Sequence, residues 1–294
     1  MPETFRQPVF MISAAVVLVF VLIGAAVPEG FKSGADAALG WVTTYFGWFY
    51  LLSVFGFVMV LVYLAFSRYG EVRLGPPDSR PDYSFFSWIA MLLAAGFGVG
   101  LVFYGLAEPM TFFLEPPYGD MEGGTEQAAR YAIQYAFFDW GVHQWAAFAI
   151  VGLIIAYFQF RKGEAGLVST TLEHVTERLP GSKKLGTAFD VFAVVATVVG
   201  VATSLGLGVL QINGGLNYVA GVPEGFLWQA IILAVMFCAY MASAASGLDK
   251  GIKILSNINL SLAIALMLFI LVFGPTLTIL NTVVQGLGDY LQHF

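Results

Sequence analysis

The stretch AAGFGVGLVFYGLAEP, residues 94–109, places glycines at three alternate positions inside an otherwise apolar segment. Gly96, Gly98 and Gly100 together cost about 2–3 kcal/mol of helix propensity relative to alanine. Tight packing against a neighbouring helix uses small residues four apart, which suits two of these glycines but not Gly98. The other interpretation is a backbone that unwinds at membrane depth, which is tolerated where it lines a cavity or is buried in protein. The pattern favours unwinding, with backbone groups available to a substrate or an ion.

The composition is typical of a membrane protein. Of the 294 residues, 59% are hydrophobic and 11% are charged, a balance that excludes an ordinary water-soluble domain. The single Cys238 cannot form a disulfide within the chain or a cysteine-based metal site. A net charge of -6 without a basic patch argues against a nucleic-acid partner. We therefore expect neither a metal nor a redox cofactor.

An all-α integral membrane protein with seven transmembrane helices is predicted, because a helix needs about 20 apolar residues to cross the bilayer. The segments of that length are 8–27, 44–66, 85–107, 129–160, 187–217, 226–245 and 252–280. All but two of the 13 Lys and Arg residues, Lys32 and Arg130, fall in intervals on one side. The positive-inside rule then places the N-terminus in the cytoplasm and, with an odd number of spans, the C-terminus outside. Residues 281–294 form an amphipathic tail that suits the outer membrane interface.

The fourth segment contains an aromatic stretch, YAFFDWGVHQWAAF, residues 135–148. On a continuous helix, Trp140, Trp145 and Phe148 fall within one broad face, and Trp140 lies too deep for an interfacial belt. Such a face suits a quaternary ammonium group, which is attracted to aromatic rings and takes no hydrogen bond. Packing of bulky rings between helices is the alternative.

Asp139 and His143 lie one turn apart in the same segment. Ionisable residues inside a membrane are candidates for a proton relay, an ion ligand or a counter-ion, and a buried Asp–His hydrogen bond is the alternative. In the fifth segment, Thr197 offers a hydroxyl suited to Na+, although such hydroxyls also bond to their own helix or a neighbour. For Glu108, beside Pro109, we expect a structural cap or an interfacial role.

Four stretches together resemble the betaine/choline/carnitine transporter family. They are the G-x-G-x-G run followed by FYGLAEP, then FFDWGVHQWAAFAIVGLIIAYFQFRKG, then TVVGVATSLGLGVLQINGGL, and finally SGLDKGIKILSNINLSLAIALMLFILVFGPT. The resemblance covers residues 8–294. It implies a plasma-membrane secondary transporter, a symporter or exchanger, for osmolytes such as glycine betaine, choline, carnitine or ectoine. It also implies Na+ or H+ as the coupling ion, a trimer, and the first inverted repeat of a LeuT-like fold.

The resemblance also carries site residues over by position. It implies substrate contacts from the glycine run and the aromatic stretch, namely Gly96, Phe97, Gly98, Gly100, Trp140, Trp145 and Phe148. It implies an ion site near Ala94 and Phe97, with Thr197 in a second one. Three positions depart from the family pattern. Phe148 stands where tyrosine is frequent, Val201 where a second threonine is found in sodium-coupled members, and Asp139 where histidine is usual.

Length is the largest departure, because family members have twelve spans in two repeats. The resemblance therefore implies an N-terminal portion, spans one to seven. It is either a fragment truncated before the eighth span or a chain that associates with a second copy or a separate second half. The expected domains are two leading helices with a loop (1–83), a five-helix first repeat (84–280) and the interfacial tail (281–294). A non-transporting scaffold derived from a degenerate half-transporter is the alternative function. An enzyme is disfavoured, since neither a nucleophile nor a metal cluster accompanies Asp139 and His143.

Overall fold

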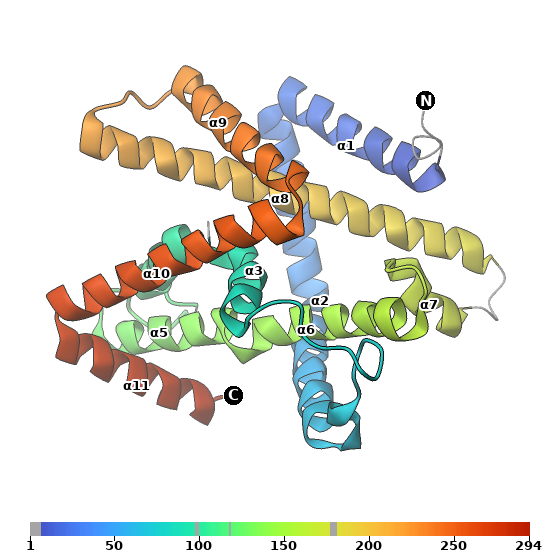
Figure 1. Cartoon of the computed structure of the whole chain (residues 1–294). Coiled ribbons are helices and arrows are strands. Elements are labelled where there is room, and N and C mark those ends of the chain that lie inside the picture. Colours follow the sequence, from blue (N-terminus) through green and yellow to red (C-terminus); the bar gives the residue numbers. More distant parts are fainter. Residues whose placement is uncertain (1–6, 98–99, 118, 177–180) are drawn as a thin grey trace. The chain divides into compact units, whose positions relative to one another are not determined.

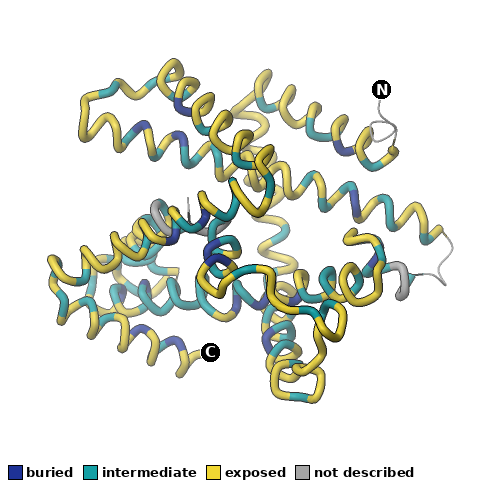
Figure 2. The backbone as a smooth tube through the Cα atoms, viewed as in Figure 1, coloured by how far each residue is buried: buried dark blue, intermediate teal, exposed yellow. Residues whose placement is uncertain are grey.

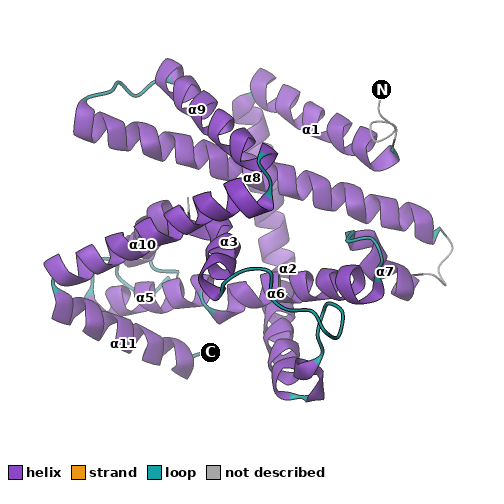
Figure 3. Cartoon of the chain, in the orientation of Figure 1, coloured by secondary structure: helices purple, strands orange, loops and turns teal. Residues whose placement is uncertain are grey.

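The structure, a computed structural model, describes residues 7–97, 100–117, 119–176 and 181–294. Within these ranges every regular element is a helix, joined by short loops (Figure 3). The all-α prediction is therefore confirmed for the part of the chain that is described.

Six helical segments in the described ranges are long and apolar enough to cross a membrane, and not the seven that we predicted. They are Pro8–Ala26, Pro28–Phe66, Glu126–Lys162, Ser182–Ala220, Phe226–Ala245 and Leu248–Phe273. The expected span 85–107 is the one that differs, because its first helix, α3 (Phe85–Phe97), has only 13 residues. At 1.5 Å per residue it reaches about 20 Å, short of the roughly 30 Å hydrocarbon core.

The chain divides into two compact units, each of which is described by itself. The first comprises the described residues within Met1–Ser79 and Val142–Val201, and the second those within Arg80–Gly141 and Ala202–Phe294. The long helix α8 (Ser182–Ala220) contributes its first part to one unit and its second part to the other.

In the first unit, α1 (Pro8–Ala26) and α2 (Pro28–Phe66) each begin with a proline, whose fixed φ and missing N–H suit the first turn of a helix. Helix α2 packs against α6 (Val142–Ala156) and against α1. The remaining elements of this unit are η2 (Arg68–Glu71), η4 (Tyr157–Lys162), α7 (Val168–Thr176) and the start of α8 (Figure 1). The nearly buried Asp190 of α8 accepts a 2.9 Å hydrogen bond from the Ser169 backbone N–H, which fixes the first turn of α7.

The second unit contains the broken third segment, made of α3, the π-helical turn η3 (Gly100–Tyr104) and α4 (Gly105–Leu114). Its other elements are α5 (Glu126–Trp140), the end of α8, α9 (Phe226–Ala245), the π-helical turn η5 (Leu248–Ile252), α10 (Lys253–Phe273) and α11 (Thr276–Gln292). Helix α3 packs along α10, whereas α5 packs against both α4 and α11. Thr125 caps α5, since its hydroxyl accepts from the Ala128 N–H at 3.2 Å.

Many large apolar residues in both units are exposed. Exposed residues, drawn in yellow, prevail along the backbone in Figure 2. In water such surfaces would aggregate, but in a bilayer they face lipid. Together with the six long apolar helices, they mark the chain as a multi-pass membrane protein.

The end of the chain differs from the sequence prediction in its helix boundary. Helix α10 ends at Phe273, and Gly274 and Pro275 separate it from α11, which begins at Thr276 and not near residue 281. The glycine and the proline explain the early break, because neither continues a helix well. Helix α11 is amphipathic as expected, and its place at the membrane interface stays a prediction.

Candidate functional site

The third segment departs from α-helical geometry close to its glycines. Gly96 and Phe97 lie in the last turn of α3, so an unwound backbone at these two residues is wrong. Gly98 lies outside the described residues. From Gly100 the chain follows the wider π-helical turn η3. Five residues after that turn ends, Pro109 lies inside α4 without an N–H to bond to the preceding turn, and π turns and prolines are the usual causes of such breaks.

Gly100 is required by the indole of Trp140. A Cβ atom added at Gly100 would lie 2.8 Å from Cζ3 and 2.9 Å from Cη2 of that ring, well inside van der Waals contact. The glycine therefore lets α5 bring its last side chain directly onto the backbone of the broken segment. The sequence pattern predicts unwinding at this glycine, and the structure adds close approach of the indole as a reason for it.

Glu108 contacts the same indole at its ring nitrogen. The Nε1–H of Trp140 donates a hydrogen bond to Oε2 of Glu108, one turn into α4. The ring of Tyr104, the last residue of η3, lies 6.3 Å from the Trp140 ring at an interplanar angle of 36°. Asp139 lies close enough to Glu108 for their carboxyl groups to interact. We name Gly100, Tyr104, Glu108, Asp139 and Trp140 the indole site.

From its place in the sequence, Glu108 was expected only to cap a helix or to lie at the interface. The structure shows it bonded to Trp140 and not simply capping a helix. The signal was present in the sequence, because an acidic residue beside a proline in an apolar segment is a functional candidate by default. What was missing was the knowledge that α4 and α5 pack together, which no local pattern gives.

The aromatic stretch is not one continuous helix. Helix α5 ends at Trp140, α6 begins at Val142, and Gly141 between them has φ -94° and ψ -143°. A Cβ at Gly141 would lie 2.2 Å from the carbonyl oxygen of Phe137, so only glycine fits this break. The single face that we drew through Trp140, Trp145 and Phe148 assumed an unbroken helix, so the helical wheel does not support it and a common face stays a prediction.

Trp145 and Phe148 belong to the first unit, whereas the indole site belongs to the second. Their rings lie 5.8 Å apart, and Phe148 is 63% exposed. His143 is buried in the first unit. A shared site that includes these residues and Trp140 stays a prediction.

The two predicted ion sites also fall in different units. Ala94 lies within α3 of the second unit. Thr197 lies in the first unit, and its hydroxyl donates a 2.8 Å hydrogen bond to the Ala193 carbonyl within an unbroken α8. This is the local bonding that we set against a Na+ ligand, and the ion role stays a prediction. Across the described residues, no group of three or more His, Cys, Asp or Glu side chains could hold a metal ion.

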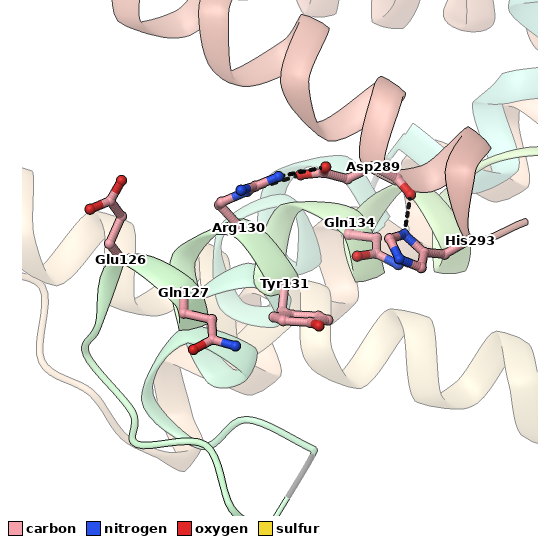
Figure 4. Close-up of a pocket in the computed structure, with 7 residues that line it drawn as sticks. All are labelled: Glu126, Gln127, Arg130, Tyr131, Gln134, Asp289 and His293. Atoms are coloured by element: carbon pink, nitrogen blue, oxygen red, sulfur yellow. Dashed lines mark hydrogen bonds and ion pairs between the residues drawn. The ribbon is translucent and has the colours of Figure 1, made fainter.

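Helix α11 covers α5 beside the indole site. Tyr290 is buried and stacks on Phe137 at 6.2 Å, and Arg130 of α5 forms a 2.7 Å ion pair with Asp289 (Figure 4). The polar cavity next to that pair has a volume of about 500 Å³. Residues from both helices line it, namely Glu126, Gln127, Arg130, Tyr131, Gln134, Asp289 and His293. The contact fixes α5, which carries Trp140.

Comparison with known proteins gives consistent relatives. The ectoine/hydroxyectoine transporter of Virgibacillus pantothenticus is 50% identical over 99% of this chain and 58% of its own length. The glycine betaine transporter OpuD of Bacillus subtilis is 48% identical over 97% of this chain and 55% of its own length. A probable glycine betaine transporter of Desulfitobacterium hafniense is 44% identical over 98% of this chain and 58% of its own length. The chain thus spans about half the length of the curated relatives it matches.

These matches state how much of each relative the chain covers, but not which part of it. The expectation that the chain is an N-terminal portion is therefore not confirmed. A family model described as the betaine/carnitine/choline family transporter matches residues 8–294. Its members are transporters and not enzymes, in agreement with the sequence analysis. With a match over nearly its whole length, the chain belongs to the betaine/carnitine/choline transporter family.

Proposed function

We propose that this chain contributes the indole site to a secondary transporter of quaternary-ammonium and related osmolytes. Glycine betaine and choline are the substrates that the site chemistry favours, with carnitine and ectoine as further candidates. The observation that carries the proposal is a single one, the Trp140 indole fixed between Gly100 and Glu108 in a membrane-embedded break. The names of the relatives support the substrate class.

The physical argument begins with the fixed indole. A trimethylammonium group gains about 2 kcal/mol from a desolvated aromatic face, provided that the ring does not have to be ordered on binding. The bond from Nε1 to Glu108 and the seat on Gly100 order the ring beforehand. The carboxylate of Glu108 adds attraction for the cation without competing with the ring face.

We further propose that binding is coupled to Na+ or H+, by symport or exchange. The proposed site for this cation lies near Ala94 and Phe97, in the last turns of α3 beside the broken segment. Thr197 is the proposed side-chain ligand of a second Na+. Asp139 and His143 are the proposed proton-carrying groups, and Asp139 interacts with Glu108 of the indole site.

The proposed orientation has the N-terminus in the cytoplasm and the C-terminus outside. Arg68, Arg73 and Arg80 precede the broken segment, and Arg161 and Lys162 follow the next span. Both groups stay on the cytoplasmic side only if α3, η3 and α4 cross the membrane together. We propose a plasma-membrane homo-oligomer, a trimer as in the family, and we keep Trp145 and Phe148 as further proposed substrate contacts.

Binding to the purified protein in lipid nanodiscs tests the proposal. Trp140→Ala is expected to weaken the binding of radiolabelled choline and glycine betaine by about 5–30-fold, the equivalent of a lost cation–π contact. The matched control is Trp48→Ala, because Trp48 is 66% exposed on α2. Equal loss in both variants, or unchanged binding in Trp140→Ala, would refute the site. Uptake into proteoliposomes with imposed Na+ or pH gradients then separates a transporter from a scaffold that only binds.

A further inference from the structure

A second concave surface lies in the first unit, between α1 and the first part of α8. It is a groove of about 900 Å³. The α1 residues that line it recur every four positions, and the α8 residues form a stripe along one side, as neighbours on a helix face do. The lining consists of Pro8, Ile12, Val16, Phe20, Lys183, Lys184, Thr187, Ala188, Val191, Phe192, Val195, Ala196 and Val199. We call this surface the α1/α8 groove.

The groove is amphiphilic along its length. Lys183 and Lys184 lie at one end, at the start of α8, and Thr187 follows one turn later. Every other lining residue is apolar, and none of the residues described there is acidic. An occupant that matches this lining carries negative charge at one end and a hydrocarbon chain behind it.

The dimensions match a lipid. The lining extends along α8 from Lys183 to Val199, a rise of about 24 Å, and along α1 from Pro8 to Phe20, a rise of about 18 Å. One leaflet contributes about 15 Å of hydrocarbon, so the groove holds an acyl chain and the start of its headgroup. The small side chains of Ala188 and Ala196 leave room for the chain between two helices.

The charged end points to one leaflet. Lys183 and Lys184 belong to the basic intervals that the positive-inside rule assigns to the cytoplasm. Anionic lipids gather in the cytoplasmic leaflet, and basic pockets between transmembrane helices hold their headgroups. We propose that the α1/α8 groove binds one anionic phospholipid, with its phosphate at the two lysines and an acyl chain between the helices. This site is separate from the indole site and does not depend on transport.

Native mass spectrometry of the purified full chain in neutral detergent measures the site directly. Phosphatidylglycerol and phosphatidylcholine with identical acyl chains are titrated, and the dissociation constant of the first bound lipid is compared. Wild type is expected to prefer phosphatidylglycerol. Lys183→Gln combined with Lys184→Gln is expected to weaken that lipid by about 25-fold, about fivefold for each lysine, and to leave phosphatidylcholine unchanged.

A matched control removes the same charge elsewhere. Lys250→Gln combined with Lys253→Gln lies at the start of another basic helix, outside the groove lining, and is expected to keep the wild-type preference. Ala188→Trp fills the groove below the lysines and is expected to weaken both lipids. Equal affinities of wild type for the two lipids, or equal losses in the two double variants, would overturn the proposal.

A protein occupant is the competing outcome. Ala188→Cys, in a chain whose Cys238 is replaced by alanine, places a thiol in the groove. Failure to form a disulfide-linked dimer is expected if lipid fills the groove. A disulfide between two copies at this position would show that another chain covers it and would overturn the lipid assignment.

Discussion

Replacing Gly100 by alanine tests the close approach on which the indole site rests. The new methyl group would lie 2.8–2.9 Å from two carbons of the Trp140 ring, whereas carbon atoms prefer about 3.5–4.0 Å. The indole or the backbone of η3 must therefore move by about 1 Å. Overpacking of this kind costs about 1–3 kcal/mol, and the higher helix propensity of alanine returns up to about 1 kcal/mol.

The expected net effect of Gly100→Ala is a loss of up to about 2 kcal/mol in stability, together with a clear loss of substrate affinity. Gly105→Ala is the matched control, because a Cβ at Gly105 meets nothing within 4 Å. That variant is expected to be neutral or slightly more stable and to bind normally. Thermal unfolding in detergent and binding of radiolabelled choline measure both quantities.

The double variant Gly100→Ala with Trp140→Phe, together with the two single variants, completes a double-mutant cycle. Phenylalanine is smaller than tryptophan, so the second change should recover part of the stability lost in the first. Identical stability and binding in Gly100→Ala and Gly105→Ala would refute the close approach. Additive losses in the double variant would show that residues 100 and 140 do not touch.

Three further outcomes are expected. Glu108→Gln keeps an oxygen acceptor for the indole N–H and removes the carboxylate. Choline binding should weaken by about 30-fold, because a carboxylate roughly 8 Å from the ammonium group contributes about 2 kcal/mol. Unchanged affinity would contradict the electrostatic role of Glu108. In thermal unfolding, Gly286→Ala should lower the stability more than Arg130→Met does. A Cβ at Gly286 would lie 2.4 Å from an isoleucine of α5, whereas an exposed ion pair contributes under about 1 kcal/mol. A larger loss of stability in Arg130→Met would contradict this packing of α11 on α5. The hydrogen bond to Asp249 raises the pKa of Tyr83 above its usual 10.0, so this contact is present at neutral pH and is lost as the pH rises through the folded pKa. Absorbance titration of the wild type should show a tyrosine that ionises at higher pH than the others and that Tyr83→Phe lacks. Titration curves with the same midpoint in both proteins would count against the bond.

Composition and hydropathy were enough to predict an all-α membrane protein, because bilayer thickness and backbone hydrogen bonding leave little choice for such a chain. They missed the count of long helices for a local reason. Residues 85–107 are apolar throughout, so hydropathy sees one span, whereas the backbone changes to a π-helical turn at Gly100. The glycines indicated a break but did not fix its position, and Gly96 and Phe97 are α-helical.

The aromatic stretch shows a second limit of prediction from the sequence. A helical wheel assumes constant geometry, and Gly141 interrupts it between Trp140 and Trp145. Glu108 shows a third, since its partner lies 32 positions away on another helix. Periodicity carries information about neighbours on the same element, whereas the indole site depends on which elements pack together.

The central claim is that Trp140 contacts the substrate, and fluorine NMR of protein labelled with fluorotryptophan tests it most directly. Trp140→Phe assigns the resonance of this residue, and Trp48 provides a lipid-exposed reference in the same spectrum. Titration with choline is expected to shift the Trp140 resonance saturably and to leave that of Trp48 unmoved. A Trp140 resonance that stays in place while radiolabelled choline binds would contradict the account.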